Sequence, residues 1–126
     1  MGVRRDIVPR VKSGVTTRRR HKKVLAMTKG QRATRHSLYR RAHEAMLKSL
    51  SYAYRHRRER KGDMRRLWIS RVNAASRAQG LTYGQFMDGL RKSGVEINRK
   101  LLADMAVREP ESFANLVTLA RGEIQD

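Results

Sequence analysis

The feature that most constrains the fold is a long segment without helix-breaking residues. From about Arg35 to about Arg77 the chain has no proline, and its only glycine is Gly62. A helix over this segment would span roughly 60 Å at about 1.5 Å per residue, so much of it must extend beyond a small domain. Gly62 costs about 1 kcal/mol relative to alanine inside a helix. We therefore expect a bend or fraying at that position.

Charge divides the sequence into two different parts. The chain has 30 Lys and Arg against 11 Asp and Glu, a formal net charge of +19. Residues 1–71 hold 23 of these cations and 4 of the acids, whereas residues 72–126 hold 7 of each. Such a division is typical of a basic extension joined to an ordinary folded module.

The stretch from Arg55 to Asn73 joins these two parts. Its first half is almost entirely cationic, and its second half begins an apolar face at helical spacing, made of Met64, Leu67, Trp68, Val72 and Ala75. We predict a basic extension over residues 1–61, with an extended tail over residues 1–14 followed by helices. A small helical globular domain is predicted over residues 62–126.

Helix boundaries can be predicted at several positions. Thr16 or Thr17 is a candidate N-cap for a first helix over residues 18–29, which Gly30 would end. Gly80 would end the long helix. A capping box at Thr82 and Gln85, an Asn98 cap and Pro110 in a first turn predict three further helices. No segment alternates as a strand does, so the predicted fold class is all-α.

The apolar faces of these last helices predict the core of the globular domain. They contain Tyr83, Phe86, Met87, Leu90, Leu101, Leu102, Met105, Ala106, Phe113, Leu116, Val117, Ala120 and Ile124, with Ile97 packing just before the second of them. Trp68 is expected to join the same core. Arg71 falls within the apolar face of its helix, so it must be paired or reach solvent. We expect a carboxylate of the C-terminal module, Glu96 or Asp104, to lie nearby.

The basic runs carry the functional signal. Residues 18–23 and 55–61 are too dense in charge for an ordinary solvated face, and phosphates bind such clusters with release of counterions. Tyr39, Tyr52 and Tyr54 lie between the runs and could stack on unpaired bases. For Tyr52 and Tyr54 the alternative is packing against their own neighbours. An anionic membrane is a weaker alternative, because the extension lacks the aromatic and leucine-rich face of an interfacial helix.

No catalytic or metal-binding constellation is present in the sequence. Glu59 and Asp63 are four residues apart, but they lie among Arg and Lys and are better explained by ion pairs on a helix surface. His36 and His43 lack a convergent third ligand, and the chain has no cysteine. We therefore expect no catalytic residue, no metal site and no cofactor.

Several blocks of the sequence resemble the family of bacterial large-subunit ribosomal protein number twenty, over about residues 10–121. They include Arg10-Val-Lys-Ser-Gly-Val15, His21-Lys-Lys-Val-Leu25, Tyr52-Ala-Tyr-Arg55, Leu67-Trp-Ile-Ser-Arg-Val-Asn-Ala-Ala75 and Asn98-Arg-Lys-Leu-Leu-Ala-Asp-Met-Ala106. The resemblance implies a non-enzymatic, cytoplasmic component of the ribosome that binds 23S rRNA and acts early in large-subunit assembly. It also implies neighbouring ribosomal proteins as partners and, in some bacteria, repression of translation from its own mRNA.

The sequence departs from the family pattern at a few positions. Residues 2–9 lie ahead of the usual start, and Gln31 stands where an aromatic residue is common. Composition alone does not distinguish RNA from DNA, so the resemblance decides between them. A DNA-binding architectural or regulatory protein is the rival class, but such proteins usually place their basic groups on a compact recognition element. The compact half of this chain is neutral.

The residues expected to bind RNA are mostly cations of the extension and of the long helix. They are Arg10, Lys12, Arg18, Arg19, Arg20, His21, Lys22, Lys23, Lys29, Arg32, Arg35, Arg40, Arg41, Lys48, Tyr52, Arg55, Arg57, Arg58, Arg60, Lys61, Arg65, Arg66, Asn73 and Arg77. On a helical wheel Arg66, Ser70, Asn73 and Arg77 form one row. We expect this polar row, as we call it below, to place two guanidinium groups on phosphates and Asn73 on a ribose or base edge.

Overall fold

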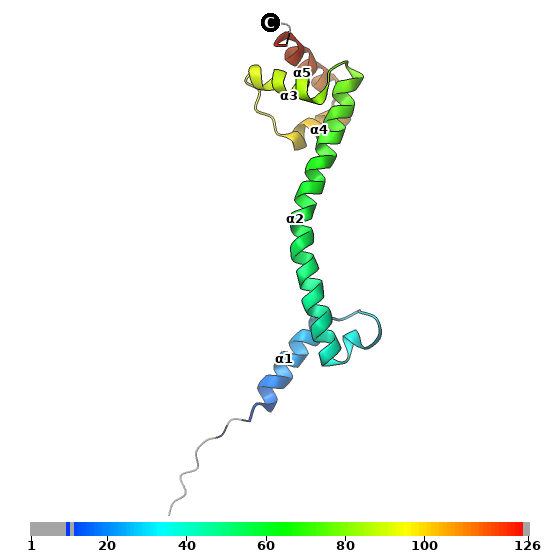
Figure 1. The fold of residues 1–126 in the computed structure, drawn as a ribbon, viewed down its shortest axis with the longest axis vertical. Coiled ribbons are helices and arrows are strands. Elements are labelled where there is room, and N and C mark those ends of the chain that lie inside the picture. Colours follow the sequence, from blue (N-terminus) through cyan, green and yellow to red (C-terminus); the bar gives the residue numbers. More distant parts are fainter. Residues whose placement is uncertain (1–9, 11, 125–126) are drawn as a thin grey trace, which may run out of the picture. The chain divides into compact units, whose positions relative to one another are not determined.

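The computed structural model describes residue 10 and residues 12–124. These residues contain five α-helices, one short 3-10 helix and no strand, so the all-α prediction is confirmed (Figure 1). The chain divides into two compact units, one up to Arg55 and one from His56 onward. Most of the predicted extended tail lies outside the described residues, and Gly14 already belongs to the first helix.

In the first unit, α1 (Gly14–Met27) precedes the 3-10 helix Ala33–His36. The prediction that Thr16 or Thr17 caps α1 is wrong, because the helix begins earlier and the Thr16 hydroxyl donates to the Ser13 carbonyl within its first turn (2.9 Å). The predicted end of the helix is close to the observed one. Gly30 follows α1 with a φ of 83°, a left-handed conformation that glycine adopts without strain.

The long helix α2 covers Tyr39–Ala78, 40 residues. It begins later than expected because the segment after Gly30 forms the 3-10 turn. The backbone stays α-helical through Gly62, so fraying there is not observed. At the other end Gly80 has a φ of 84°. The Leu81 amide donates to the Ser76 carbonyl and the Gly80 amide to the Arg77 carbonyl, both at 3.0 Å. This is a Schellman motif, as expected for a glycine stop.

In the second unit the end of α2 is followed by α3 (Tyr83–Lys92), α4 (Arg99–Arg108) and α5 (Pro110–Gly122). The capping box is confirmed, because Thr82 and Gln85 exchange hydrogen bonds between side chain and backbone (3.0 and 3.4 Å). Asn98 caps α4 by accepting from the Leu101 amide at 2.9 Å. Pro110 lies in the first turn of α5. Each helix therefore begins where its local sequence signal places it.

The core of the second unit gathers these helices around the end of α2. Its buried residues are Val72, Leu81, Phe86, Leu90, Leu102, Ala103, Phe113, Val117 and Ala120. Phe86 and Phe113 are almost fully buried, with ring centroids 5.1 Å apart. Trp68 is half-buried against this cluster, as expected. Leu101 is 53% exposed, so its assignment to the core is wrong. Leu102 and Ala103 occupy the inner side of α4 instead.

Burial predicts that the two units differ in stability. Among the described residues of the first unit, only Val24, Thr28 and Ala42 are buried, whereas the second unit has a contiguous core. Amides in residues 14–55 should therefore exchange with solvent much faster than those in residues 83–122 when no RNA is bound, since local stability follows buried apolar contacts. Hydrogen exchange of the RNA-free protein measures this difference. Equal protection of residues 39–55 and of α5 would contradict it.

Candidate nucleic-acid interface

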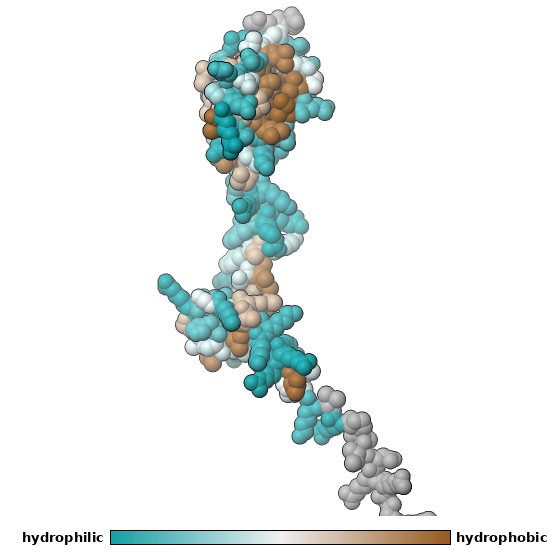
Figure 2. Space-filling view, turned by 180° about the vertical axis from the view of Figure 1, so that it is seen from behind, coloured by the Kyte–Doolittle hydropathy of each residue, from teal (hydrophilic) through white to brown (hydrophobic). Residues whose placement is uncertain are grey.

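The structure places the predicted RNA-binding residues at the surface. All of them, from Arg10 to Arg77, are exposed except His21 and Asn73, which are half-buried. Hydrophilic side chains cover most of the middle of α2 on the face drawn in Figure 2. The only acids described between residues 12 and 71 are Glu44, Glu59 and Asp63. The surface is therefore strongly cationic over its whole length.

These acids form local ion pairs along α2. Glu44 lies 3.9 Å from both Arg40 and Arg41, and Asp63 lies 3.3 Å from Arg66. All are i,i+3 or i,i+4 pairs between exposed side chains, which contribute little to stability. The interpretation of Asp63 as a helix-surface ion-pair partner is thus confirmed for its pair with Arg66.

His21 has a packing role that the sequence did not reveal. Its ring stacks on Tyr39 with centroids 3.6 Å apart and an angle of 15° between the planes. Tyr39 also lies 5.8 Å from the ring of His43. These contacts join α1 to the start of α2 within the first unit. Tyr39 therefore packs against its own neighbours, and its stacking on an unpaired base stays a prediction.

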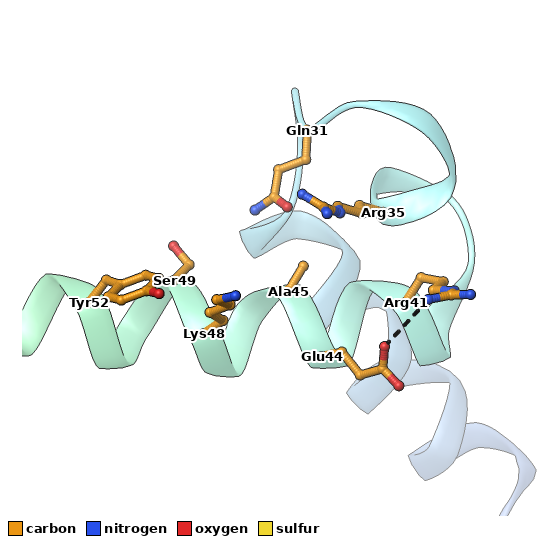
Figure 3. A pocket seen from close by; sticks show the side chains of 8 residues that line it. All are labelled: Gln31, Arg35, Arg41, Glu44, Ala45, Lys48, Ser49 and Tyr52. Atoms are coloured by element: carbon orange, nitrogen blue, oxygen red, sulfur yellow. Dashed lines mark ion pairs between the residues drawn. The ribbon is translucent and has the colours of Figure 1, made fainter.

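A slot of about 440 Å³ lies between the loop after α1 and the first half of α2 (Figure 3). Gln31 and Arg35 reach toward α2 from the loop side, and Tyr52 lies toward one end. The remaining lining residues come from α2: Arg41, Glu44, Ala45, Lys48 and Ser49. Ala45 and Ser49 are small, so a space remains between the two segments. We call this space the loop–helix slot.

Cations surround the aromatic ring of this slot. The Arg55 guanidinium lies 4.9 Å from the centroid of the Tyr52 ring, and the Lys48 ammonium lies 5.8 Å from it. Tyr52 itself is 41% exposed. The sequence predicted Tyr52, Arg35, Arg41 and Lys48 as RNA-binding residues but missed the polar groups of Gln31 and Ser49. The small residues Ala45 and Ser49, four positions apart on α2, were a usable signal for the slot.

The polar row on α2 lies at the surface of the second unit. The Arg77 Nε donates to Asn73 Oδ1 at 3.1 Å, so the amide fixes the guanidinium one turn further along the helix. Arg66 is held by Asp63, as described above, and Ser70 is exposed. The row is therefore partly ordered by its own hydrogen bonds and is accessible to a ligand.

Arg71 has Asp104 nearby, as expected, but does not pair with it. Its side chain is exposed and lines a shallow hollow of about 290 Å³ with Trp68 and Asp104. Asp104 instead pairs with Arg108 at 3.0 Å, and no ion pair joins Arg71 to a carboxylate of the described residues. The position of a residue on a helical wheel fixes only the direction in which its side chain leaves the backbone. The long aliphatic stem of arginine allows its charged end to reach water from the border of an apolar face.

Some cations of α3 and α4 have local partners. Asp88 accepts from Arg91 at 2.9 Å and lies 3.4 Å from Lys92. The hydrogen bond from Arg91, followed by that from Lys92, lowers the pKa of the Asp88 carboxyl below its usual value. Arg99 donates to the Tyr83 hydroxyl at 2.8 Å. Residues 72–126, which are neutral as a whole, thus also hold several of their cations beside local partners.

Other kinds of site find no support in the described part of the chain. It contains no group of three or more His, Cys, Asp or Glu side chains that could hold a metal ion. No helix within it combines the length and the apolar character needed to cross a bilayer.

Fold and surface together define the class: an all-α protein with a densely cationic helical surface and a small, locally neutral helical module. The chain matches the family model described as Ribosomal protein L20 over residues 10–116. It is 60% identical over 111 residues to the large ribosomal subunit protein bL20 of Dehalococcoides mccartyi, covering 88% of this chain and 93% of that protein. It is 56% identical over 117 residues to the protein of the same name from Natranaerobius thermophilus, covering 93% and 100%.

The chain therefore belongs to the Ribosomal protein L20 family. Membership confirms the resemblance found in the sequence and makes this a structural protein rather than an enzyme. It also places the protein in the ribosome, in the cytoplasm, as predicted.

Proposed function

We propose that this protein binds 23S rRNA directly and promotes early assembly of the large ribosomal subunit. As a member of its family it is a structural constituent of that subunit, in association with rRNA and neighbouring ribosomal proteins. The family resemblance also supports its own mRNA as a further partner, through which it would repress translation of its operon. Residues 1–61 form the RNA-contacting extension in this proposal, and residues 62–126 form the folded domain.

The exposed cationic surface is the observation that carries the proposal. Cations along α1 and α2 project into solvent in many directions, and only Glu44, Glu59 and Asp63 lie among them in the described residues up to position 71. Repulsion between like charges makes such a surface unfavourable in isolation, whereas phosphates on several sides would neutralise it. A surface of this kind fits RNA that surrounds the helices better than a single flat partner.

Crosslinking in living cells tests the proposal directly. Ultraviolet crosslinking followed by mapping of the bound nucleotides should recover 23S rRNA, and the crosslinks should already be present in early precursors of the large subunit. Recovery of DNA or of unrelated RNA in place of 23S rRNA would contradict direct rRNA binding. Crosslinks confined to mature subunits would contradict the early role in assembly.

We expect the polar row to contribute specificity in addition to charge. Asn73→Ala removes the amide and also releases the Arg77 guanidinium from its hydrogen bond. The variant should discriminate less well between cognate rRNA and an unrelated RNA duplex, by about fivefold to tenfold for a lost hydrogen bond of about 1 kcal/mol. Competition binding at matched salt measures this ratio. The melting temperature should stay nearly unchanged, because Asn73 is outside the buried core.

A matched control is available in the same unit. Asn115 is an exposed asparagine of α5, outside the polar row. Asn115→Ala should leave discrimination unchanged. Equal discrimination by the parent and by Asn73→Ala would show that the row is only a solvated face.

A further inference from the structure

We propose that the loop–helix slot binds one unpaired RNA nucleotide, whose base stacks on Tyr52 and whose phosphate lies near Arg35 and Lys48. This inference rests on the proposed rRNA binding and adds the kind of RNA element that the first unit recognises. It assigns a distinct role to a place where the chain leaves an open space between two of its own segments (Figure 3).

The charge of the lining selects an anionic ligand. Arg35, Arg41 and Lys48 line the slot, and Glu44 is the single acid. Glu44 already lies 3.9 Å from Arg41, so this carboxylate and this guanidinium partly neutralise each other. Neither Arg35 nor Lys48 is in an ion pair with a carboxylate of the described residues. The slot therefore offers a net positive charge at its loop side and along α2.

The size of the slot suits a single small group. Its volume of about 440 Å³ is within the range of about 300–1,000 Å³ that is typical of small-ligand pockets. Gln31 and Arg35 lie on the loop side of the slot, across from α2 (Figure 3), and a space of this size is too small for a double helix. A base within a duplex is paired and stacked on its neighbours, whereas an unpaired base can turn out and stack on an aromatic side chain.

The polar groups complete the match to a nucleotide. Gln31 presents an amide with both a donor and an acceptor, and Ser49 presents a hydroxyl with both functions. Tyr52 provides an aromatic ring with Lys48 and Arg55 within 6 Å of its centroid (5.8 and 4.9 Å). An acidic peptide would use the cations, but it has no flat π-surface for the ring.

The test compares two RNA hairpins that differ in one nucleotide. One hairpin carries a single unpaired 2-aminopurine in its stem, and the other has the same stem without it. With the full-length protein, the unpaired 2-aminopurine should lose fluorescence on binding because it stacks. Tyr52→Leu should weaken binding of the bulged hairpin by about fivefold to 100-fold, the effect of removing one aromatic platform. Binding of the fully paired hairpin should not change.

Three variants separate stacking from other effects. Tyr52→Phe keeps the ring and should bind like the parent. Ser49→Leu fills the slot without altering any charge, so it should reproduce the loss. Leu50→Ala removes an apolar side chain two residues away, which is exposed and does not line the slot, so it should have no effect. Circular dichroism verifies that helix content is preserved in each variant.

Each outcome bears on one proposal. If the parent binds neither hairpin even at low salt, the proposed RNA binding itself fails. If the parent binds both hairpins and Tyr52→Leu weakens both equally or neither, only the nucleotide slot is overturned. Displacement of the bulged RNA by oligoglutamate, with the same dependence on Tyr52, would assign the slot to an acidic protein segment and would also overturn the nucleotide.

Discussion

A variant in which five cations of α1 are replaced by glutamine is expected to bind 23S rRNA about 100- to 10,000-fold more weakly than the parent near 0.1 M salt. The replaced residues are Arg18, Arg19, Arg20, Lys22 and Lys23. The estimate follows from counterion release, in which each phosphate contact contributes about 0.7–0.9 to the slope of log affinity against log salt. All five side chains are exposed on α1. Glutamine retains good helix propensity. Filter binding over a series of salt concentrations measures both the affinity and the slope.

The control uses two cations of α3, within the neutral residues 72–126. Arg91 and Lys92 are adjacent on α3 and already pair with Asp88. Replacing both by glutamine should change the slope of log affinity against log salt far less, per charge removed, than the α1 substitutions do. An unchanged slope in the α1 variant, with helix content preserved, would show that the extension is not the electrostatic anchor. Equal slopes per charge in the two variants would contradict the proposed division of roles.

Local sequence signals predicted the end of α2 and the starts of α3 to α5, but not the starts of α1 and α2. The capping box of Thr82 and Gln85 and the Asn98 cap are both observed, because each requires only hydrogen bonds between residues three apart. Gly80 lies at a left-handed position directly after the long helix, as its identity suggested. Such features depend on near neighbours in the chain and can be deduced without tertiary structure.

Features that depend on distant residues were not predicted. The stack of His21 on Tyr39 requires the path of the loop after α1, which the sequence does not specify. The exposure of Leu101 depends on which side of α4 faces α5, and Leu102 and Ala103 occupy that side. The loop–helix slot likewise combines Gln31 with Tyr52, which only the fold brings to one place.

Gly89 is a further example of such a distant dependence. It is buried within α3 at a point where α5 comes unusually close. A methyl group at this position would lie 2.4 Å from the Ala120 carbonyl oxygen and 2.8 Å from its Cα. The obstacle is backbone, which cannot move aside as a flexible side chain could. The sequence shows only a glycine within a helical apolar pattern, which indicates a packing reason without its partner.

Gly89→Ala should therefore lower the free energy of unfolding of the second unit by about 1–3 kcal/mol, as an overpacked core does. The matched control is Gly84→Ala, the same substitution in the same helix, where a methyl group meets nothing within 4 Å. Because alanine favours the helix, Gly84→Ala should leave stability unchanged or raise it by up to about 1 kcal/mol. Urea denaturation followed by circular dichroism measures both changes. If the two variants unfold at the same urea concentration, α3 and α5 do not pack as closely as Gly89 and Ala120 indicate.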